Sequence, residues 1–164
     1  MNIKKYIPNA LTCGNLLSGC IGIVYAFNSE LKMVAFFVLI SGVLDFFDGF
    51  AARLLNVKSE IGKELDSLAD VISFGFLPGV LIFQMLQNLQ FGNWSYIGFL
   101  ITIFSALRLA KFNIDTRQTQ DFIGLNTPTN TFFIISLPWL IEDYPVINNE
   151  YLFLAITLIT SYLL

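Results

Sequence analysis

The sequence predicts an all-α integral membrane protein, built as a bundle of about six transmembrane helices, and three observations support this. The chain of 164 residues is 55% hydrophobic and only 13% charged, with 17 phenylalanines, which is more apolar than soluble domains of this size. Its apolar residues fall into six runs separated by polar loops, as expected for membrane spans. Four aspartates lie inside or beside two of these runs, where an ionised group needs a partner or a function.

The six candidate spans follow one another along a single predicted membrane domain, residues 1–164. A bilayer core needs ~20 helical residues, and the fifth run is the shortest. The chain ends at Leu164 within apolar sequence, and no basic residue closes the last span. This favours a C-terminal truncation of a longer natural protein. The expected spans cover residues 8–27, 31–55, 64–86, 94–111, 128–141 and 150–164.

The basic residues predict the orientation of the bundle. Eight of the nine cations fall before the first span or in alternate loops on the same side, and Lys32 is the exception. An excess of Lys and Arg marks the cytoplasmic side, so we expect both termini to be cytoplasmic. The eight are Lys4, Lys5, Arg53, Lys58, Lys63, Arg108, Lys111 and Arg117.

The composition also excludes several classes of function. The chain has no His, which removes His-based acid–base chemistry and His-ligated zinc. No basic patch indicates a nucleic-acid partner. Cys13 and Cys20 are seven residues apart on one expected helix, too far along its axis for a disulfide, so they are interpreted as packing residues.

The aspartates predict a metal site that faces the cytoplasm. Asp45 and Asp48 are three residues apart, and Asp66 and Asp70 are four apart, so each pair shares one helix face. Two antiparallel neighbouring helices place both pairs ~10 Å from the cytoplasmic ends of their spans. Converging carboxylates without His or Cys suit a hard cation such as Mg²⁺, Mn²⁺ or Ca²⁺. The alternative is four acids that each reach separately toward water, which the short Asp side chain does poorly.

Three residues beside the first acid pair have two interpretations each. Gly49 and Ala52 share the helix face of Asp45 and Asp48, and their small side chains either admit a bulky ligand or allow close helix packing. Arg53 either holds a phosphate or anchors the span at the cytoplasmic boundary.

The spacing of these residues resembles the signature of a known family. The pattern Asp45-x2-Asp48-Gly49-x2-Ala52-Arg53-x8-Gly62-x3-Asp66-x3-Asp70 is similar to that of the CDP-alcohol phosphotransferases over 26 residues. Three further stretches resemble the serine-using branch of that family, the CDP-diacylglycerol–serine O-phosphatidyltransferases or phosphatidylserine synthases. They are residues 8–16, 105–113 and 122–128, and the third departs from the pattern because Asn126 and Thr129 stand where prolines are expected.

The resemblance implies a reaction between two substrates at a membrane. The serine hydroxyl attacks the phosphorus next to the diacylglycerol of CDP-diacylglycerol, and CMP leaves as phosphatidylserine forms. The expected partners are these substrates, membrane lipids and a second copy of the chain in a homodimer. The expected location is a prokaryotic inner or plasma membrane.

The resemblance also implies roles for single residues. Asp45, Asp48, Asp66 and Asp70 are expected to bind two Mg²⁺ or Mn²⁺ ions, with Ca²⁺ as a further candidate. Asp70 is the expected general base. The expected contacts of the CDP group are Asp48, Gly49, Ala52, Arg53 and Gly62, of which Gly62 permits the turn into the third span.

Other polar residues are weaker candidates. Arg108, Lys111, Asn113 and Thr127 are possible contacts of the acceptor or of a lipid phosphate, with membrane anchoring and loop capping as the alternatives. Asn130 is a further candidate for the acceptor pocket, with loop capping as the alternative. Asn9 and Thr12 are possible nucleotide contacts, or helix caps.

Two stripes of small residues predict close helix contacts, either within the chain or in a dimer. They are Gly14, Ser18 and Gly22 in the first span, and Gly75 and Gly79 in the third.

Two alternative functions remain open from the sequence. The same chemistry with glycerol 3-phosphate or inositol phosphate as acceptor needs an extra basic pocket, for which Arg108, Lys111 and Arg117 are the candidates. A divalent-cation transporter also places acids within the membrane, but here the acids gather toward one side.

Overall fold

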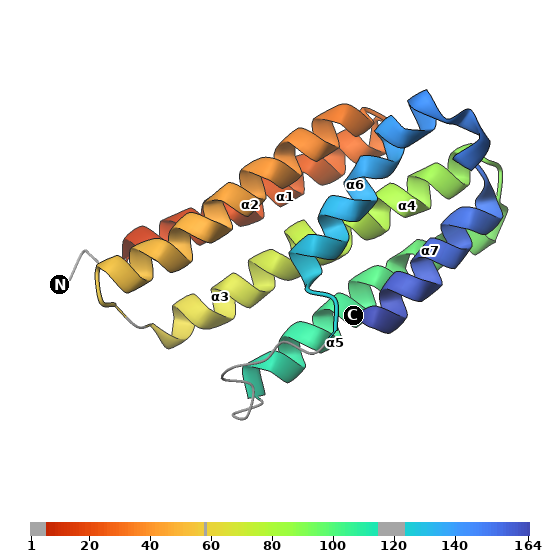
Figure 1. The fold of residues 1–164 in the computed structure, drawn as a ribbon. Coiled ribbons are helices and arrows are strands. Elements are labelled where there is room, and N and C mark those ends of the chain that lie inside the picture. Colours follow the sequence, from red (N-terminus) through yellow and green to blue (C-terminus); the bar gives the residue numbers. More distant parts are fainter. Residues whose placement is uncertain (1–5, 58, 115–123) are drawn as a thin grey trace.

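The computed structural model describes residues 6–57, 59–114 and 124–164, and within them it contains helices and no strands. The predicted all-α fold class is confirmed (Figure 1). Lys4, Lys5, Lys58 and Arg117, which entered the predicted orientation, lie outside the described residues. The helical elements are α1 (Tyr6–Phe27), α2 (Leu31–Leu54), α3 (Glu60–Asp70), η2 (Val71–Phe76), α4 (Leu77–Asn88), η3 (Gly92–Phe99), α5 (Leu100–Ile114), α6 (Thr127–Asp143), η4 (Pro145–Ile147) and α7 (Glu150–Leu163).

Four helical segments of the described chain are long and apolar enough to cross a membrane. They are α1, α2, the continuous rod 60–88 formed by α3, η2 and α4, and the rod 92–114 formed by η3 and α5. The predicted fifth and sixth spans also form helices, α6 and α7, but these have 17 and 14 residues. A helix of that length rises ~21–26 Å, which is less than the ~30 Å hydrocarbon core.

Small residues of α1 allow it to pack closely against α2, its antiparallel neighbour, and against the rod 60–88. Gly19 faces Ser73, and Gly22 faces Leu77 and Phe37. The Ser18 hydroxyl donates to the carbonyl of Phe37, at 2.8 Å. The stripe predicted in the first span therefore packs inside the chain, where added side chains would clash.

The central rod packs against its neighbours through its own small residues. A Cβ atom on Gly75 would lie 3.0 Å from that of Ser105, and one on Gly79 would lie 2.6 Å from the Thr102 Oγ1. The second predicted stripe thus forms the contact between this rod and the rod 92–114.

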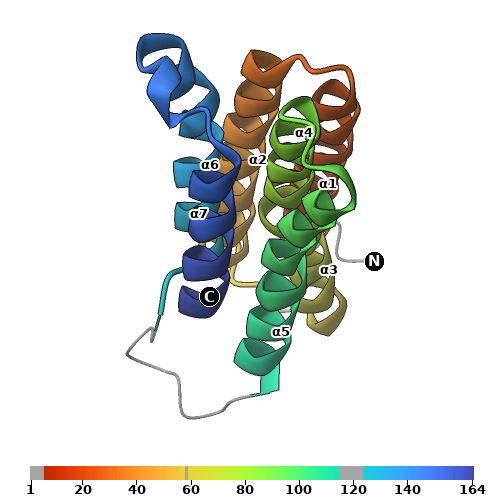
Figure 2. The same ribbon diagram turned by 90° about the vertical axis from the view of Figure 1, so that its right-hand side faces the viewer.

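The hydrophobic core surrounds α4, against which α1, α5, α6 and α7 pack (Figures 1 and 2). Leu77 and Leu81 of α4 are fully buried, together with Phe74, Ile134 and Phe153 from neighbouring elements. The four aspartates of the predicted site lie outside this core, toward the end of the bundle where α2 ends and α3 begins. The core therefore holds the rods together and leaves the opposite half of α1, α2 and α3 available for polar residues.

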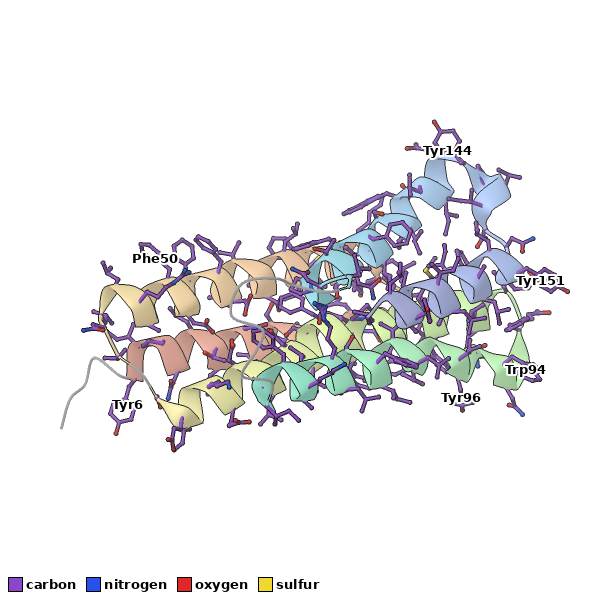
Figure 3. The ribbon with its side chains drawn as sticks, turned by 60° about the horizontal axis from the view of Figure 1, so that its bottom comes forward. Tyr6, Phe50, Trp94, Tyr96, Tyr144 and Tyr151 are labelled. Carbon is purple, nitrogen blue, oxygen red and sulfur yellow. The ribbon has the colours of Figure 1, made fainter. Side chains whose placement is uncertain are left out.

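The two ends of the bundle differ in the number of cations that they contain. Arg53, Lys63, Arg108 and Lys111 belong to the end that contains the link from α2 to α3. Lys32 lies at the other end and forms an ion pair with Glu142, at 3.1 Å. Figure 3 shows Trp94, Tyr96, Tyr144 and Tyr151 near that second end, where aromatic residues typically mark a membrane interface.

Candidate metal centre and its two cavities

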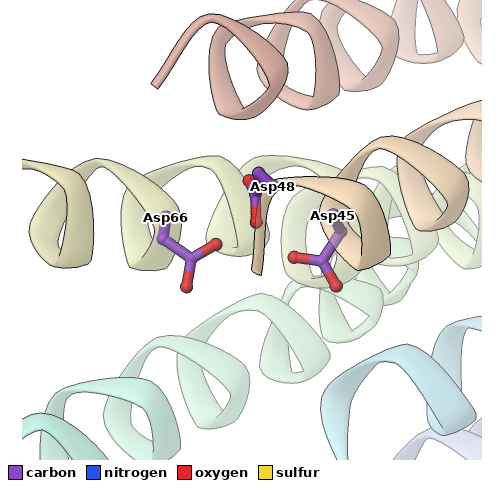
Figure 4. Close-up of side chains that lie close together, drawn as sticks. All are labelled: Asp45, Asp48 and Asp66. Atoms are coloured by element: carbon purple, nitrogen blue, oxygen red, sulfur yellow. The ribbon is translucent and has the colours of Figure 1, made fainter. Parts of the chain in front are cut away.

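Three carboxylates from two neighbouring helices face one another (Figure 4). Asp45 and Asp48 lie in the last three turns of α2, and Asp66 lies in the middle of α3. One oxygen from each lies within 4.8 Å of the others. Asp48 is 6% exposed, and the other two are partly buried. This geometry differs from that of acids that each reach separately toward water.

Asp70 lies one turn beyond Asp66, at the end of α3. It is within hydrogen-bonding reach of Asp45 and accepts a hydrogen bond from the Asn15 amide nitrogen, at 3.3 Å. The structure thus brings the four predicted acids into one region, with three of them in a compact group and Asp70 beside it.

The compact group fits a divalent cation. Three like charges within a few ångströms repel one another strongly in a partly buried site, and a cation removes that repulsion. Among the described residues, the Asp66 Oδ1 is buried without a hydrogen-bond partner, which leaves a lone pair free for a ligand. Carboxylate oxygens favour hard cations. Asp45, Asp48 and Asp66 can therefore hold a metal ion.

A first cavity of about 610 Å³ opens on one side of the acids. Gly49 faces open space, with no atom within 4 Å of a Cβ atom built there; this agrees with the interpretation that Gly49 admits a ligand. The walls include the predicted nucleotide and CDP contacts Asn9, Thr12, Asp48, Gly49, Ala52 and Gly62, together with Asp66.

Thr12 lies inside α1 rather than at its start, so it does not cap that helix. Its hydroxyl lies 2.6 Å from the Asp48 Oδ2, to which it donates, and 3.1 Å from the Pro8 carbonyl. Gly62 lies inside α3 rather than in a turn before it, so the predicted turn at Gly62 is wrong. A Cβ atom there would lie 2.8 Å from the Asn9 Oδ1, so glycine allows α1 and α3 to approach.

Arg53 is placed differently from the sequence expectation. Its side chain is exposed, and its Nε donates to the Gly49 carbonyl in the preceding turn, at 3.1 Å. Arg53 is not among the described residues that line the first cavity. Its predicted phosphate contact therefore requires a different rotamer.

A second cavity of about 400 Å³ opens on the other side of Asp66. Its walls include Asp70 and the predicted acceptor contacts Arg108, Lys111, Asn113 and Thr127. The Asn113 amide nitrogen donates to the Ser67 hydroxyl, at 2.8 Å, and Arg108 donates to the Leu125 carbonyl. The cap of α6 is Asn126, which accepts from the Thr129 N–H at 2.8 Å.

Sequence reasoning missed two residues of this region. Asn15 is fully buried, donates to Asp70, and accepts on its carbonyl from Ser41 and Ser73. An amide inside an apolar span was the signal that could have identified it. Lys63 lines both cavities, which becomes visible only once α3 and α5 are placed side by side.

Comparisons with known proteins find relatives that match along the whole chain. The chain is 35% identical over 169 residues to the CDP-diacylglycerol–serine O-phosphatidyltransferase of Helicobacter pylori, covering 100% of this chain and 71% of that protein. It is 39% identical over 129 residues to the Bacillus subtilis protein of the same name, covering 76% and 70%. It is 30% identical over 167 residues to the archaetidylserine synthase of Methanothermobacter thermautotrophicus, covering 97% and 70%. The family model for CDP-alcohol phosphatidyltransferase matches residues 5–163, and the chain therefore belongs to the CDP-alcohol phosphatidyltransferase family.

Proposed function

We propose that this protein transfers the phosphatidyl group of CDP-diacylglycerol to L-serine, which yields phosphatidylserine and CMP. The names of its relatives support serine as the acceptor. The observation on which the proposal depends most is the position of the carboxylates, because Asp66 borders two separate cavities. Such a boundary suits a group transfer between two substrates that enter from different sides.

The first cavity is assigned to the cytidine diphosphate. Gly49 leaves room beside the helix backbone, and Asn9 and Thr12 offer polar groups on the facing wall. The second cavity is assigned to serine, because Arg108 and Lys111 can bind its carboxylate there. Asn113 and Thr127 complete that wall.

We assign Asp45, Asp48 and Asp66, with Asp70 beside them, to two Mg²⁺ or Mn²⁺ ions, and keep Ca²⁺ as a candidate. Bound there, such ions neutralise the pyrophosphate and stabilise the charge that develops on departing CMP. This role agrees with the oxygen-only donor set and with the unpartnered oxygen of Asp66.

Asp70 is the proposed general base. It accepts the proton of the serine hydroxyl while the serine oxygen forms a bond to the phosphorus next to the diacylglycerol. The bond from that phosphorus to the bridging oxygen breaks, and CMP leaves with the electron pair. The position of Asp70 supports this role, because it lines the proposed serine cavity and stands beside the compact group.

The remaining parts of the proposal concern the setting of the enzyme. Residues 1–164 are taken as one membrane domain, with the site facing the cytoplasm of a prokaryotic cell and the N-terminus on the same side. In the described part of the chain, the cations other than Lys32 lie at the end of the bundle that is assigned to the cytoplasm. This distribution supports the proposed orientation. Membrane lipids and a second copy of the chain are the proposed partners.

The experiment that tests this function is a comparison of acceptors. The purified protein is incubated with CDP-diacylglycerol and Mg²⁺ or Mn²⁺, and CMP is measured with serine, glycerol 3-phosphate or inositol phosphate in turn. We expect CMP to be released when serine is the acceptor. Release with a phosphorylated acceptor alone would overturn the serine assignment, and release with none of them would overturn the proposed function.

A further inference from the structure

Lys63 occupies an unusual place between the two cavities. It lies on α3, one turn before Asp66, and these two are the described residues that line both cavities. The family signature assigns no role to this position, since Lys63 falls between Gly62 and Asp66. Its position between the two cavities is therefore seen in the fold and does not follow from the signature.

The first cavity is lined by more acids than cations. Asp48, Glu60 and Asp66 are on its walls, and Lys63 is the one cation among the described residues that line it. A diphosphate that enters this cavity adds further negative charge. Arg53 donates instead to a carbonyl of its own helix. The ammonium of Lys63 is thus the protein group best placed to attract the donor's phosphates.

One hydrogen bond ties the exposed side chain of Lys63 to α5. Its Nζ donates to the Asn113 carbonyl of α5, at 3.0 Å, and the Asn113 side chain donates in turn to Ser67, one turn further along α3. A lysine ammonium has three N–H donors, and this contact uses one. The tie to α5 brings the charge toward the boundary and reduces the entropy that a free lysine loses on binding.

We propose that Lys63 binds a non-bridging phosphate oxygen of the donor substrate where the two cavities meet, and so fixes the phosphorus within reach of the acceptor. This inference rests on the proposed function and adds a substrate-binding residue to it. The ligand class is a diphosphate diester. The anionic group of the acceptor has its own cations, because Arg108 and Lys111 line the second cavity and not the first.

The test compares Lys63→Gln with Lys63→Arg. Loss of a charged hydrogen bond costs about 1.5–3 kcal/mol, which is a roughly 10- to 150-fold change in affinity. We expect Lys63→Gln to raise the KM for CDP-diacylglycerol by at least about tenfold, with the KM for serine within about twofold. Lys63→Arg keeps the charge and is expected to restore most of the donor affinity.

Two further variants show which cavity is affected. Lys111→Gln removes a cation that lines the second cavity alone, and we expect the KM for serine to rise in place of that for the donor. Lys32→Gln removes a cation at the opposite end of the bundle and is expected to change neither KM. An unchanged donor KM in Lys63→Gln would overturn the proposal.

A binding measurement separates this inference from the proposed function. Cytidine 5′-diphosphate with Mg²⁺ is expected to raise the melting temperature of the wild-type protein, and to raise that of Lys63→Gln by much less. Equal shifts in both proteins would reject the role of Lys63, whichever acceptor is used. A loss of intrinsic stability in Lys63→Gln with the full shift retained would assign Lys63 a purely structural tie to α5.

Discussion

Asp70 differs from the other three acids in its surroundings. It lies beside the compact group rather than within it, borders the second cavity, and accepts a hydrogen bond from the buried amide of Asn15. The donated N–H fixes one carboxylate oxygen, and the side chain also lies within hydrogen-bonding reach of Asp45. A base must lie within hydrogen-bond reach of its proton, and Asp70 lines the proposed acceptor cavity without lining the donor cavity.

The substitution Asp70→Asn removes the proton acceptor and keeps the shape of the side chain. General-base catalysis contributes about 10²–10⁴-fold, so we expect turnover to fall by that factor while donor binding largely survives. Rates of CMP release and the thermal shift with cytidine 5′-diphosphate are the two measurements. Turnover within a few-fold of wild type would remove the base assignment.

Gly49 provides a second prediction for a single residue. A side chain at this position meets open space, so Gly49→Leu is expected to leave the melting temperature nearly unchanged and to weaken donor binding by filling the first cavity. Gly22→Ala is the matched control, because its Cβ atom would lie 2.8 Å from Leu77 and stability is expected to fall. Unchanged donor KM in Gly49→Leu would contradict the assignment of this cavity.

The sequence predicted single residues well where spacing alone decides their position. Asp45, Asp48 and Asp66 meet because helical periodicity places them on facing sides of two joined helices. Rotamers and neighbours from distant segments decided the rest. The side chain of Arg53 turned to its own helix, and the positions of Asn15 and Lys63 depend on how α1 and α5 pack against α3, which no local pattern contains.

At the level of elements, the central rod is interrupted directly after Asp70. Residues Val71–Phe76 form a π-helical turn, which inserts an extra residue and rotates α4 relative to α3. The Thr102 hydroxyl of α5 donates to the Gly75 carbonyl, at 3.1 Å, and the Thr131 hydroxyl of α6 donates to that of Phe74, at 2.7 Å. These two threonines hold the turn that sets the rotation of α3 and its acids relative to α4 and the core.

Thr131→Val tests this positioning role. The substitution leaves the Phe74 carbonyl without its donor from α6, which costs about 1–3 kcal/mol, and we expect turnover to fall more than stability alone explains. Thr131→Ser keeps the hydroxyl and is expected to restore turnover. Thr157→Val is the matched control, since the buried Thr157 hydroxyl donates to Phe153 within its own helix, at 2.7 Å. Equal losses of turnover in the two valine variants would reject the role.

The helices themselves were predictable, whereas their interruptions were not. Long apolar runs identified all six helical regions, because burial in lipid requires each backbone group to bond within its own helix. The segment 71–76 has no sequence feature that distinguishes a π turn from an α-helix, since the turn depends on hydroxyls from two other helices. The end of α6 reflects local chemistry, because Pro145 follows shortly after its last residue, Asp143, and a proline lacks the N–H that would continue the helix.

The whole molecule combines a dry core with a charged polar half. The residues packed around α4 hold the rods together, and the acids add repulsion where α2 and α3 meet. A divalent cation that binds the folded state converts this repulsion into attraction and stabilises the fold by mass action. Cation binding at these three carboxylates would therefore couple the site to the stability of the bundle.

Removal of divalent cations tests this coupling without reference to turnover. At a cation concentration of 100 times Kd the gain is about 2.7 kcal/mol, so we expect the melting temperature to be roughly 5–10 °C higher with Mg²⁺ or Mn²⁺ than with EDTA. CMP release is expected to stop in EDTA and to return when the cation is restored.

Asp48→Asn removes one ligand and one of the repelling charges, so its melting temperature in EDTA is expected to exceed that of the wild type while its cation-dependent shift disappears. Glu64→Gln changes an exposed acid of α3 outside the compact group and is expected to keep the full shift. Equal shifts in Asp48→Asn and Glu64→Gln would place the cation away from these carboxylates, because a ligand that binds elsewhere stabilises both variants alike.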